Sequence, residues 1–135
     1  MKPASCPCGS GELAADCCDP ILAGTPAATA LALMRSRYTA YTRGLVDYLI
    51  ATQDPETRAP NARAEIKKFT RQTIWFGLEI VAVESGGLDD ATGIVEFVAS
   101  GQIGLARDQT FRQHERSRFR RDDRGHWLYV DGDLE

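Results

Sequence analysis

Apolar residues in the first half of the chain recur at steps of three and four, the spacing that places side chains on one face of a helix. We predict a helix from residue 27 to Gly44, a short second helix over residues 45–49, and a third, amphipathic helix over residues 62–69, after a break at Asp54 and Pro55. The apolar positions that carry this pattern are Leu31, Met34, Tyr38, Tyr41, Leu45, Tyr48, Leu49, Ala62, Ile66 and Phe69.

From residue 75 the pattern changes to period two, which is typical of β-strands. We predict strands over residues 75–83, 92–99, 110–121 and 127–131. In the first strand one face is expected to carry Phe76, Leu78, Ile80 and Ala82, and the other Trp75, Gly77, Glu79, Val81 and Val83. Because the helices come first and the strands afterwards, the order favours an α+β fold with helices on one face of an antiparallel sheet.

The strand over residues 110–121 has two chemically different faces. One face carries Phe111, Gln113, Glu115, Ser117 and Phe119, and the other carries Arg112, His114, Arg116, Arg118 and Arg120. The first set is typical of a pocket wall. The basic row, with Arg107, Arg121 and Arg124 nearby, either binds an anionic partner or is a solvated face; acidic residues beside it favour the solvated face.

Composition and charge are those of an ordinary folded protein. The 135 residues are 43% hydrophobic, with 16 basic and 19 acidic side chains and a formal charge of −3, which argues against nucleic acid as a partner. The first 18 residues lack the apolar stretch of a secretory signal, and no later run approaches the roughly 18 apolar residues of a membrane span. We therefore expect a cytoplasmic protein with no membrane association.

All four cysteines lie within thirteen positions, as Cys6, Cys8, Cys17 and Cys18. Two closely spaced pairs separated by a short loop are a plausible cage for one tetrahedral Zn²⁺, and a closed four-sulfur shell is structural rather than catalytic. Reduced thiols in the cytoplasm favour metal over disulfides. Crossed disulfides, a redox centre and an iron–sulfur cluster remain as alternatives, although this spacing is unlike the usual iron–sulfur runs.

Several segments resemble known proteins. Cys-Pro-Cys-Gly-Ser with the following Cys-Cys pair resembles the SEC-C zinc motif, which also occurs at the C-terminal end of the bacterial preprotein translocase ATPase and contributes there to chaperone binding. MRSRYTAY (34–41), VDYLIAT (46–52), WFGLEI (75–80), ERSRF (115–119) and HWLYVDG (126–132) resemble the bacterial YchJ family. The resemblance implies an NTF2-like (cystatin-like) domain, a cone of helices on a curved antiparallel sheet with an internal pocket, and it implies no activity.

If the cone is present, Tyr48, Trp75, Glu115 and Ser117 are the residues expected nearest to its pocket. Glu115 in a partly apolar cavity would suit general-base work. The favoured alternative is a buried ion pair of Glu115 with Arg35 or Arg37. The aromatic side chains are expected mainly in the core.

These observations predict a SEC-C-type zinc knuckle over residues 1–20, a linker near residues 20–26 and an NTF2-like domain over residues 25–135. The leading functional hypothesis is a binding or adaptor module, in which one structural Zn²⁺ fixes the knuckle and loop residues Gly9 to Asp16 face a protein partner. The alternative is a small-molecule-binding protein or small enzyme that uses the pocket. No Ser/His/Asp set or phosphate-binding loop is visible, so a non-enzymatic role is favoured.

Overall fold

The computed structural model describes residues 5–105 and 108–135. The elements are the 3₁₀ helix η1 (Ala14–Asp16), α1 (Cys18–Leu22), α2 (Ala30–Arg43), α3 (Val46–Ala51), α4 (Ala62–Gln72), β1 (Thr73–Ser85), β2 (Thr92–Ile103), β3 (Thr110–Arg121) and β4 (Trp127–Leu134). Their order confirms the predicted succession of helices and strands. None of the helices in the described ranges is long and apolar enough to span a membrane.

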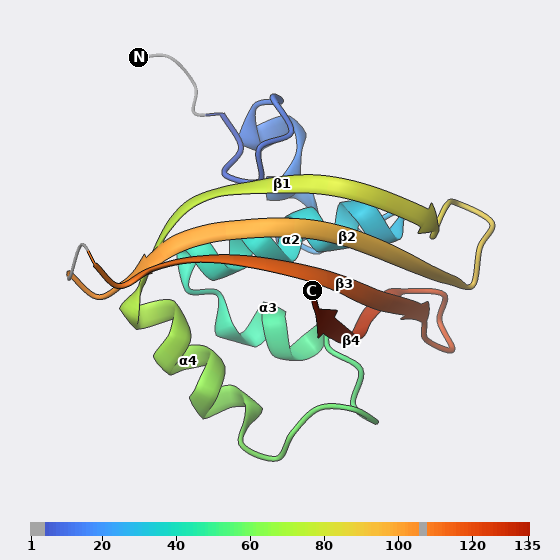
Figure 1. The fold of residues 1–135 in the computed structure, drawn as a ribbon. Helices are drawn as coiled ribbons and strands as arrows, with labels where there is room; N and C mark the ends of the chain where they lie inside the picture. Colours follow the sequence, from blue (N-terminus) through green and yellow to red (C-terminus); the bar gives the residue numbers. More distant parts are fainter. Residues whose placement is uncertain (1–4, 106–107) are drawn as a thin grey trace.

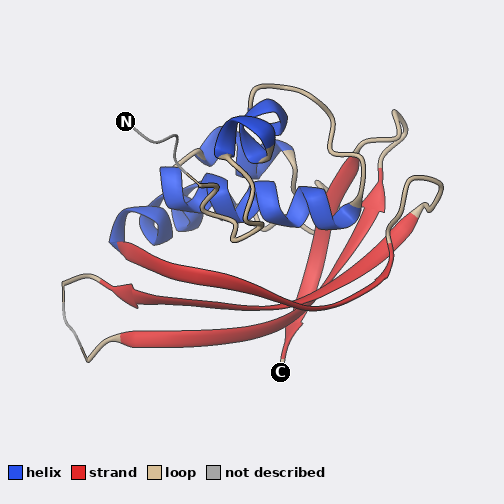
Figure 2. Ribbon diagram, turned by 90° about the horizontal axis from the view of Figure 1, so that it is seen from above, coloured by secondary structure: helices blue, strands red, loops and turns tan. Residues whose placement is uncertain are grey.

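The four strands form one antiparallel sheet in the order β1-β2-β3-β4 (Figure 1). The sheet is strongly curved, and Figure 2 shows the helices gathered on one of its sides. Because β2 pairs with β1 and β3 along its full length, it continues to Ile103, beyond the predicted end. The observed architecture confirms the predicted α+β fold.

Helix α2 is the central helix against the sheet, and its ends follow from the local sequence. The Thr29 hydroxyl caps the first turn by accepting a hydrogen bond from the Ala32 amide at 3.0 Å. Gly44 ends the helix in the left-handed region (φ 68°), where glycine carries no steric penalty. Leu33, Met34 and Tyr38 are buried against the strands.

Strand β1 departs from the predicted period-two pattern. Its pairing with β2 shifts at two bulges, and at the first of them Trp75 faces Gly101 while Gly77 faces Ser100. A bulge inserts one residue and so reverses which side later residues face. Phe76 is therefore 57% exposed, whereas Trp75 and Leu78 both pack against the core. The prediction that Phe76 and Leu78 share a face is wrong for this reason.

The cysteine segment packs directly on the domain. Three of its cysteines belong to the same buried cluster as residues from α2 and from the strands. Helix α1 occupies part of the stretch predicted as a linker, with Pro20 in its first turn, where a missing amide hydrogen costs no hydrogen bond. Leu22 and Ala27 also pack against the core. The cysteine segment and the sheet thus share one hydrophobic core.

Candidate metal centre and interior cavity

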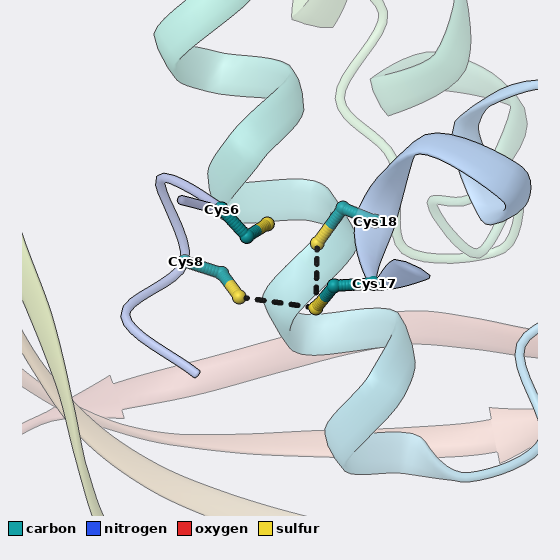
Figure 3. Close-up of side chains that lie close together, drawn as sticks. All are labelled: Cys6, Cys8, Cys17 and Cys18. Atoms are coloured by element: carbon teal, nitrogen blue, oxygen red, sulfur yellow. Dashed lines mark hydrogen bonds between the residues drawn. The ribbon is translucent and has the colours of Figure 1, made fainter. Parts of the chain in front are cut away.

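The four cysteine sulfurs converge on one point. All four ligand atoms lie within 4.8 Å of one another, with Cys8 Sγ 3.6 Å and Cys18 Sγ 3.9 Å from Cys17 Sγ (Figure 3). Sulfur atoms at about 2.3 Å from a central ion in a tetrahedron stand about 3.8 Å apart, so the observed separations fit such a site. All four thiols are free, and these distances are far longer than the roughly 2.05 Å of a disulfide bond.

The first ligand pair lies in a tight turn that the glycines permit. Gly9 and Gly11 have positive φ angles of 77° and 86°. The Cys6 amide donates to the Glu12 carbonyl at 2.9 Å and closes the turn. A side chain at Gly9 would place its Cβ 3.1 Å from the Leu78 carbonyl oxygen, so glycine also lets the turn lie close to β1.

The second ligand pair lies at a junction between two short helices. Cys17 follows η1 and directly precedes α1, and its amide donates to the Ala14 carbonyl at 3.1 Å. This sharp junction lets two adjacent residues aim their sulfurs at one site. The Ser10 hydroxyl, from the first turn, lies 3.2 Å from Cys17 Sγ and joins the two halves.

Helix α2 supplies polar groups to the cysteine cluster. Arg35 Nη1 donates to the Cys8 carbonyl at 2.8 Å and lies 3.9 Å from Cys8 Sγ. Thr39 Oγ1 lies 3.7 Å from Cys6 Sγ. Four thiolates around a dication carry a formal charge of −2, so a guanidinium beside them is favourable. The surroundings of the cluster therefore suit a metal-bound tetrathiolate.

The thiols perturb one another's protonation. Hydrogen bonding from the Cys18 thiol lowers the pKa of Cys8 to about 4. Burial raises the pKa of Cys17, and hydrogen bonding to Cys8 together with burial raises that of Cys18. The cluster thus favours one thiolate beside protonated neighbours until a bound cation displaces the protons of those neighbours. Taken with the geometry, the donor set fits a thiophilic tetrahedral ion.

A second feature is a cavity of about 120 Å³, partly open to solvent, between the helices and the concave side of the sheet. Trp75 is central to its aromatic wall, with ring centres 5.3 Å from Tyr38 and 5.6 Å from Phe69. The indole nitrogen of Trp75 is buried without a hydrogen-bond partner among the described residues. The lining residues are Met34, Arg37, Tyr38, Tyr41, Phe69, Trp75, Phe97, Ala99, Gln113, Glu115 and Tyr129.

Glu115 lies on the cavity wall and is held by neutral donors. Its Oε1 accepts from Gln113 Nε2 at 3.1 Å, and its Oε2 accepts from the Tyr129 hydroxyl at 3.1 Å and from the Ser117 hydroxyl. No ion pair among the described residues includes it. The expected pairing with Arg35 or Arg37 is therefore wrong.

Both arginines have other partners. Arg35 reaches out of the helix layer to Cys8. Arg37 Nη1 donates to the Leu49 carbonyl at 2.8 Å and to Thr52 Oγ1 at 2.6 Å, which ties α2 to α3. These local acceptors explain why the Arg37 fork is not turned onto Glu115.

Of the four predicted pocket residues, two line the cavity, one lies next to it and one lies elsewhere. Trp75 and Glu115 line it, and Ser117 lies behind the carboxylate, fully buried. Tyr48 is not part of the cavity wall, because α3 places its hydroxyl 2.5 Å from Ser36 Oγ on another side of α2. Burial raises the pKa of Tyr48.

Gly132 makes room for the Glu115 carboxylate, and the sequence pattern did not single it out. It lies directly opposite Ser117 in the β3–β4 pairing, and a Cβ atom there would be 2.7 Å from Glu115 Cδ. The missing side chain makes the space that the carboxylate occupies. A glycine inside a strand pattern is a general sign of such a close approach.

The basic row of β3 is paired with acidic side chains. Arg116 contacts Glu84 at 2.6 Å, and Arg118 contacts Asp133 at 2.8 Å. Together with the split of the strand into two faces, this supports the solvated-face interpretation for the described residues. Arg107, near this row in the sequence, lies outside the described residues.

A curved four-stranded sheet with its helices on one side, joined to a four-cysteine cluster, defines an NTF2-like protein with a SEC-C-type motif. A family model described as the YchJ middle NTF2-like domain matches residues 29–132. The chain therefore belongs to the YchJ family, which confirms the resemblance drawn from the sequence.

The relatives cover almost the whole chain. A UPF0225 protein of Chromobacterium violaceum is 50% identical over 131 residues, covering 96% of this chain and 92% of the relative. A UPF0225 protein of Geobacter sulfurreducens is 42% identical over 130 residues, covering 94% and 77%. The similarity includes the cysteine segment as well as the domain.

Two solved structures have the same fold. The solution structure of a SEC-C motif containing protein from Rhodopseudomonas palustris gives a TM-score of 0.83 at 35% identity, covering 96% of this chain and 98% of that chain. The crystal structure of a SEC-C motif containing protein from Psychrobacter arcticus gives 0.78 at 28% identity, covering 96% and 82%.

Proposed function

We propose that this protein is a small-molecule-binding protein whose interior cavity is the binding site and whose cysteine knuckle is a structural zinc staple. The observation that carries the proposal is the Glu115 carboxylate, fixed by three neutral donors on an otherwise mostly aromatic wall. Ligand sites are typically apolar cavities with a few convergent polar groups.

Zn²⁺ is the ion we propose for the knuckle, one per chain. Four sulfurs at tetrahedral spacing match its preferred coordination, and a complete thiolate shell leaves no position for substrate. Because the cysteines share a core with α2 and the strands, the ion would stabilise the whole domain. Elemental analysis under reducing conditions should give one zinc per chain, with four thiols reactive only after chelation.

Binding in the cavity is tested with three one-ring compounds, phenol, benzoate and 4-hydroxybenzoate, by NMR titration of the zinc-loaded chain. Ala99 lines the cavity and is 5% exposed, so Ala99→Leu fills it with three more carbon atoms. The matched control is Ala82→Leu, on an exposed position of β1. We expect binding that Ala99→Leu removes and Ala82→Leu retains. Absence of binding by all three compounds would contradict the proposal.

A second candidate function is a protein-binding role for the knuckle. Three of the four cysteines are buried, while Glu12, Leu13 and Asp16 are exposed on the same short segment. A metal-fixed loop that carries two acidic side chains and one apolar side chain fits a basic peptide with an apolar anchor.

Charge reversal tests this second role. Glu12→Lys combined with Asp16→Lys should abolish cross-linking to partners captured by the unmodified protein, while zinc content stays at one per chain. Asp89→Lys, on an exposed turn far along the chain, is the matched control. Unchanged cross-linking in the double variant would exclude the loop as the contact surface.

A further inference from the structure

The cavity holds a buried cation without an ionic partner. Arg37 is 4% exposed, and it lines the cavity with its Cζ 4.8 Å from the centre of the Tyr129 ring. A guanidinium has five N–H donors, yet within the described chain only Nη1 has protein acceptors, and both of those are neutral. The other guanidinium nitrogens of Arg37 have no acceptor among the described residues and are not fully buried, so they can donate to an anionic group in the cavity.

The same cavity holds a carboxylate without a cationic partner. A carboxylate offers about four acceptor positions, and three donors occupy three of those on Glu115. One position on Oε1 remains. Elsewhere in the described chain acidic and basic groups do pair, as Arg120 does with the buried Asp54 through two hydrogen bonds of 2.6 and 2.9 Å. Arg37 and Glu115 are thus opposite charges on one cavity wall that form no ion pair with each other.

The size of the cavity limits what can bind between these groups. A cavity of about 150 Å³ is known to hold benzene, and pockets for drug-sized ligands start at about 300 Å³. At about 120 Å³ the space is of the size that takes one small ring, and because it is partly open to solvent, polar substituents on such a ring can extend beyond it. Aromatic side chains on several sides suit a flat ligand.

We propose, building on the cavity-binding function above, that the ligand is a small carboxylic acid with a hydrogen-bond donor at its other end. Its carboxylate would pair with Arg37, and a hydroxyl or amine at its other end would donate to Glu115 Oε1, with a one-ring apolar body between them. Such a molecule would pair the Arg37 charge and fill the remaining acceptor position of Glu115 at once. A purely apolar ligand would leave both unpaired.

The test compares compounds of one size by calorimetric and NMR titration of the zinc-loaded chain. The probe 4-hydroxybenzoate carries both groups, 4-hydroxybenzamide lacks the charge, and benzoate lacks the donor. Replacing the hydroxyl by an amine, in 4-aminobenzoate, distinguishes the two kinds of donor. We expect 4-hydroxybenzoate or 4-aminobenzoate to bind about 10- to 100-fold more tightly than the amide, as a charge-assisted pair provides.

Two variants assign the ends of the ligand. Arg37→Gln should remove the preference for 4-hydroxybenzoate over 4-hydroxybenzamide. Glu115→Gln should remove the preference for 4-hydroxybenzoate over benzoate. Ile66→Ala removes a buried side chain of the second core cluster that does not line the cavity, so it controls for loss of stability and should retain both preferences. If Arg37→Gln does not fold, the Glu115→Gln comparison still tests whether the donor end of the ligand binds at Glu115.

Three outcomes are distinguishable. Preferences that disappear in the matching variants support a carboxylic acid with a donor at its other end. Tighter binding of phenol or the amide, or preferences that persist in both variants, would overturn the ligand class while cavity binding stands. If none of the compounds binds, the proposed function itself fails and the ligand class with it.

Discussion

Replacing Gly132 by alanine tests whether the Glu115 carboxylate is held where the structure places it. Gly132 lies within β4 and has no positive φ, so alanine adds no backbone strain there. Its Cβ would stand 2.7 Å from Glu115 Cδ and 2.9 Å from Glu115 Cγ, closer than such atoms approach. The carboxylate must therefore move away from its hydrogen-bond donors.

The expected cost follows from the donors that the carboxylate leaves. Ser117 is fully buried, and its hydroxyl would lose Glu115 as its acceptor. The Tyr129 hydroxyl would lose the same acceptor. An unsatisfied buried donor costs about 1–3 kcal/mol, and the Tyr129 hydroxyl lies beside the cavity, so we expect about 2–4 kcal/mol in total. For a domain of this size that is a Tm lower by about 8–16 °C.

Thermal denaturation followed by circular dichroism measures the effect, with Gly77→Ala as the matched control. Gly77 also lies in a strand, and nothing stands within 4 Å of its Cβ position, so alanine there should be neutral or stabilise by about 0.5–1 kcal/mol. In the Glu115→Ala background the cost of Gly132→Ala should disappear. Equal Tm values for Gly132→Ala and Gly77→Ala would refute the reasoning.

Three further predictions concern the metal centre and an internal ion pair. Arg35→Ala should lower zinc affinity about 10- to 100-fold in a chelator competition, because its guanidinium supports the Cys8 turn. Arg120 holds the pKa of Asp54 below its ordinary value, so the pair stabilises the fold above about pH 4, and this contribution disappears as pH falls through the lowered pKa. Asp54→Asn should flatten that part of a pH–stability curve. Chelating the metal should weaken 4-hydroxybenzoate binding, measured by titration before and after zinc is restored.

Local sequence signals predicted the elements that depend on local interactions. The end of α2 at Gly44 follows from one glycine, and the two faces of β3 follow from period two. The convergence of four cysteines was likewise predictable, because two closely spaced cysteine pairs separated by a short loop are typical of metal ligands. These features need no knowledge of the tertiary structure.

Features that depend on pairing between distant segments were not predictable in the same way. A bulge in β1 arises from its register with β2, and nothing in the composition of residues 75–80 marks Phe76 as the residue that turns outward. The partners of Glu115 depend likewise on the register between β3 and β4, which brings Gly132 opposite Ser117. The residue types alone predicted an arginine partner for Glu115. In the structure the Ser117 and Tyr129 hydroxyls and the Gln113 amide donate to it instead.

Helix α2 supplies residues to both candidate sites and so connects them. Arg35 and Thr39 reach the cysteine cluster, while Arg37 and Tyr38 line the cavity from neighbouring positions on the helix. Any shift of α2 toward or away from the knuckle therefore moves cavity residues as well. Because interiors are close-packed and transmit strain, a metal that fixes the knuckle also fixes the position of the Arg37 guanidinium relative to Glu115. The cysteine cluster and the cavity are thus two parts of one mechanical unit, and under the proposed function a metal in the knuckle would affect ligand binding without contacting the ligand.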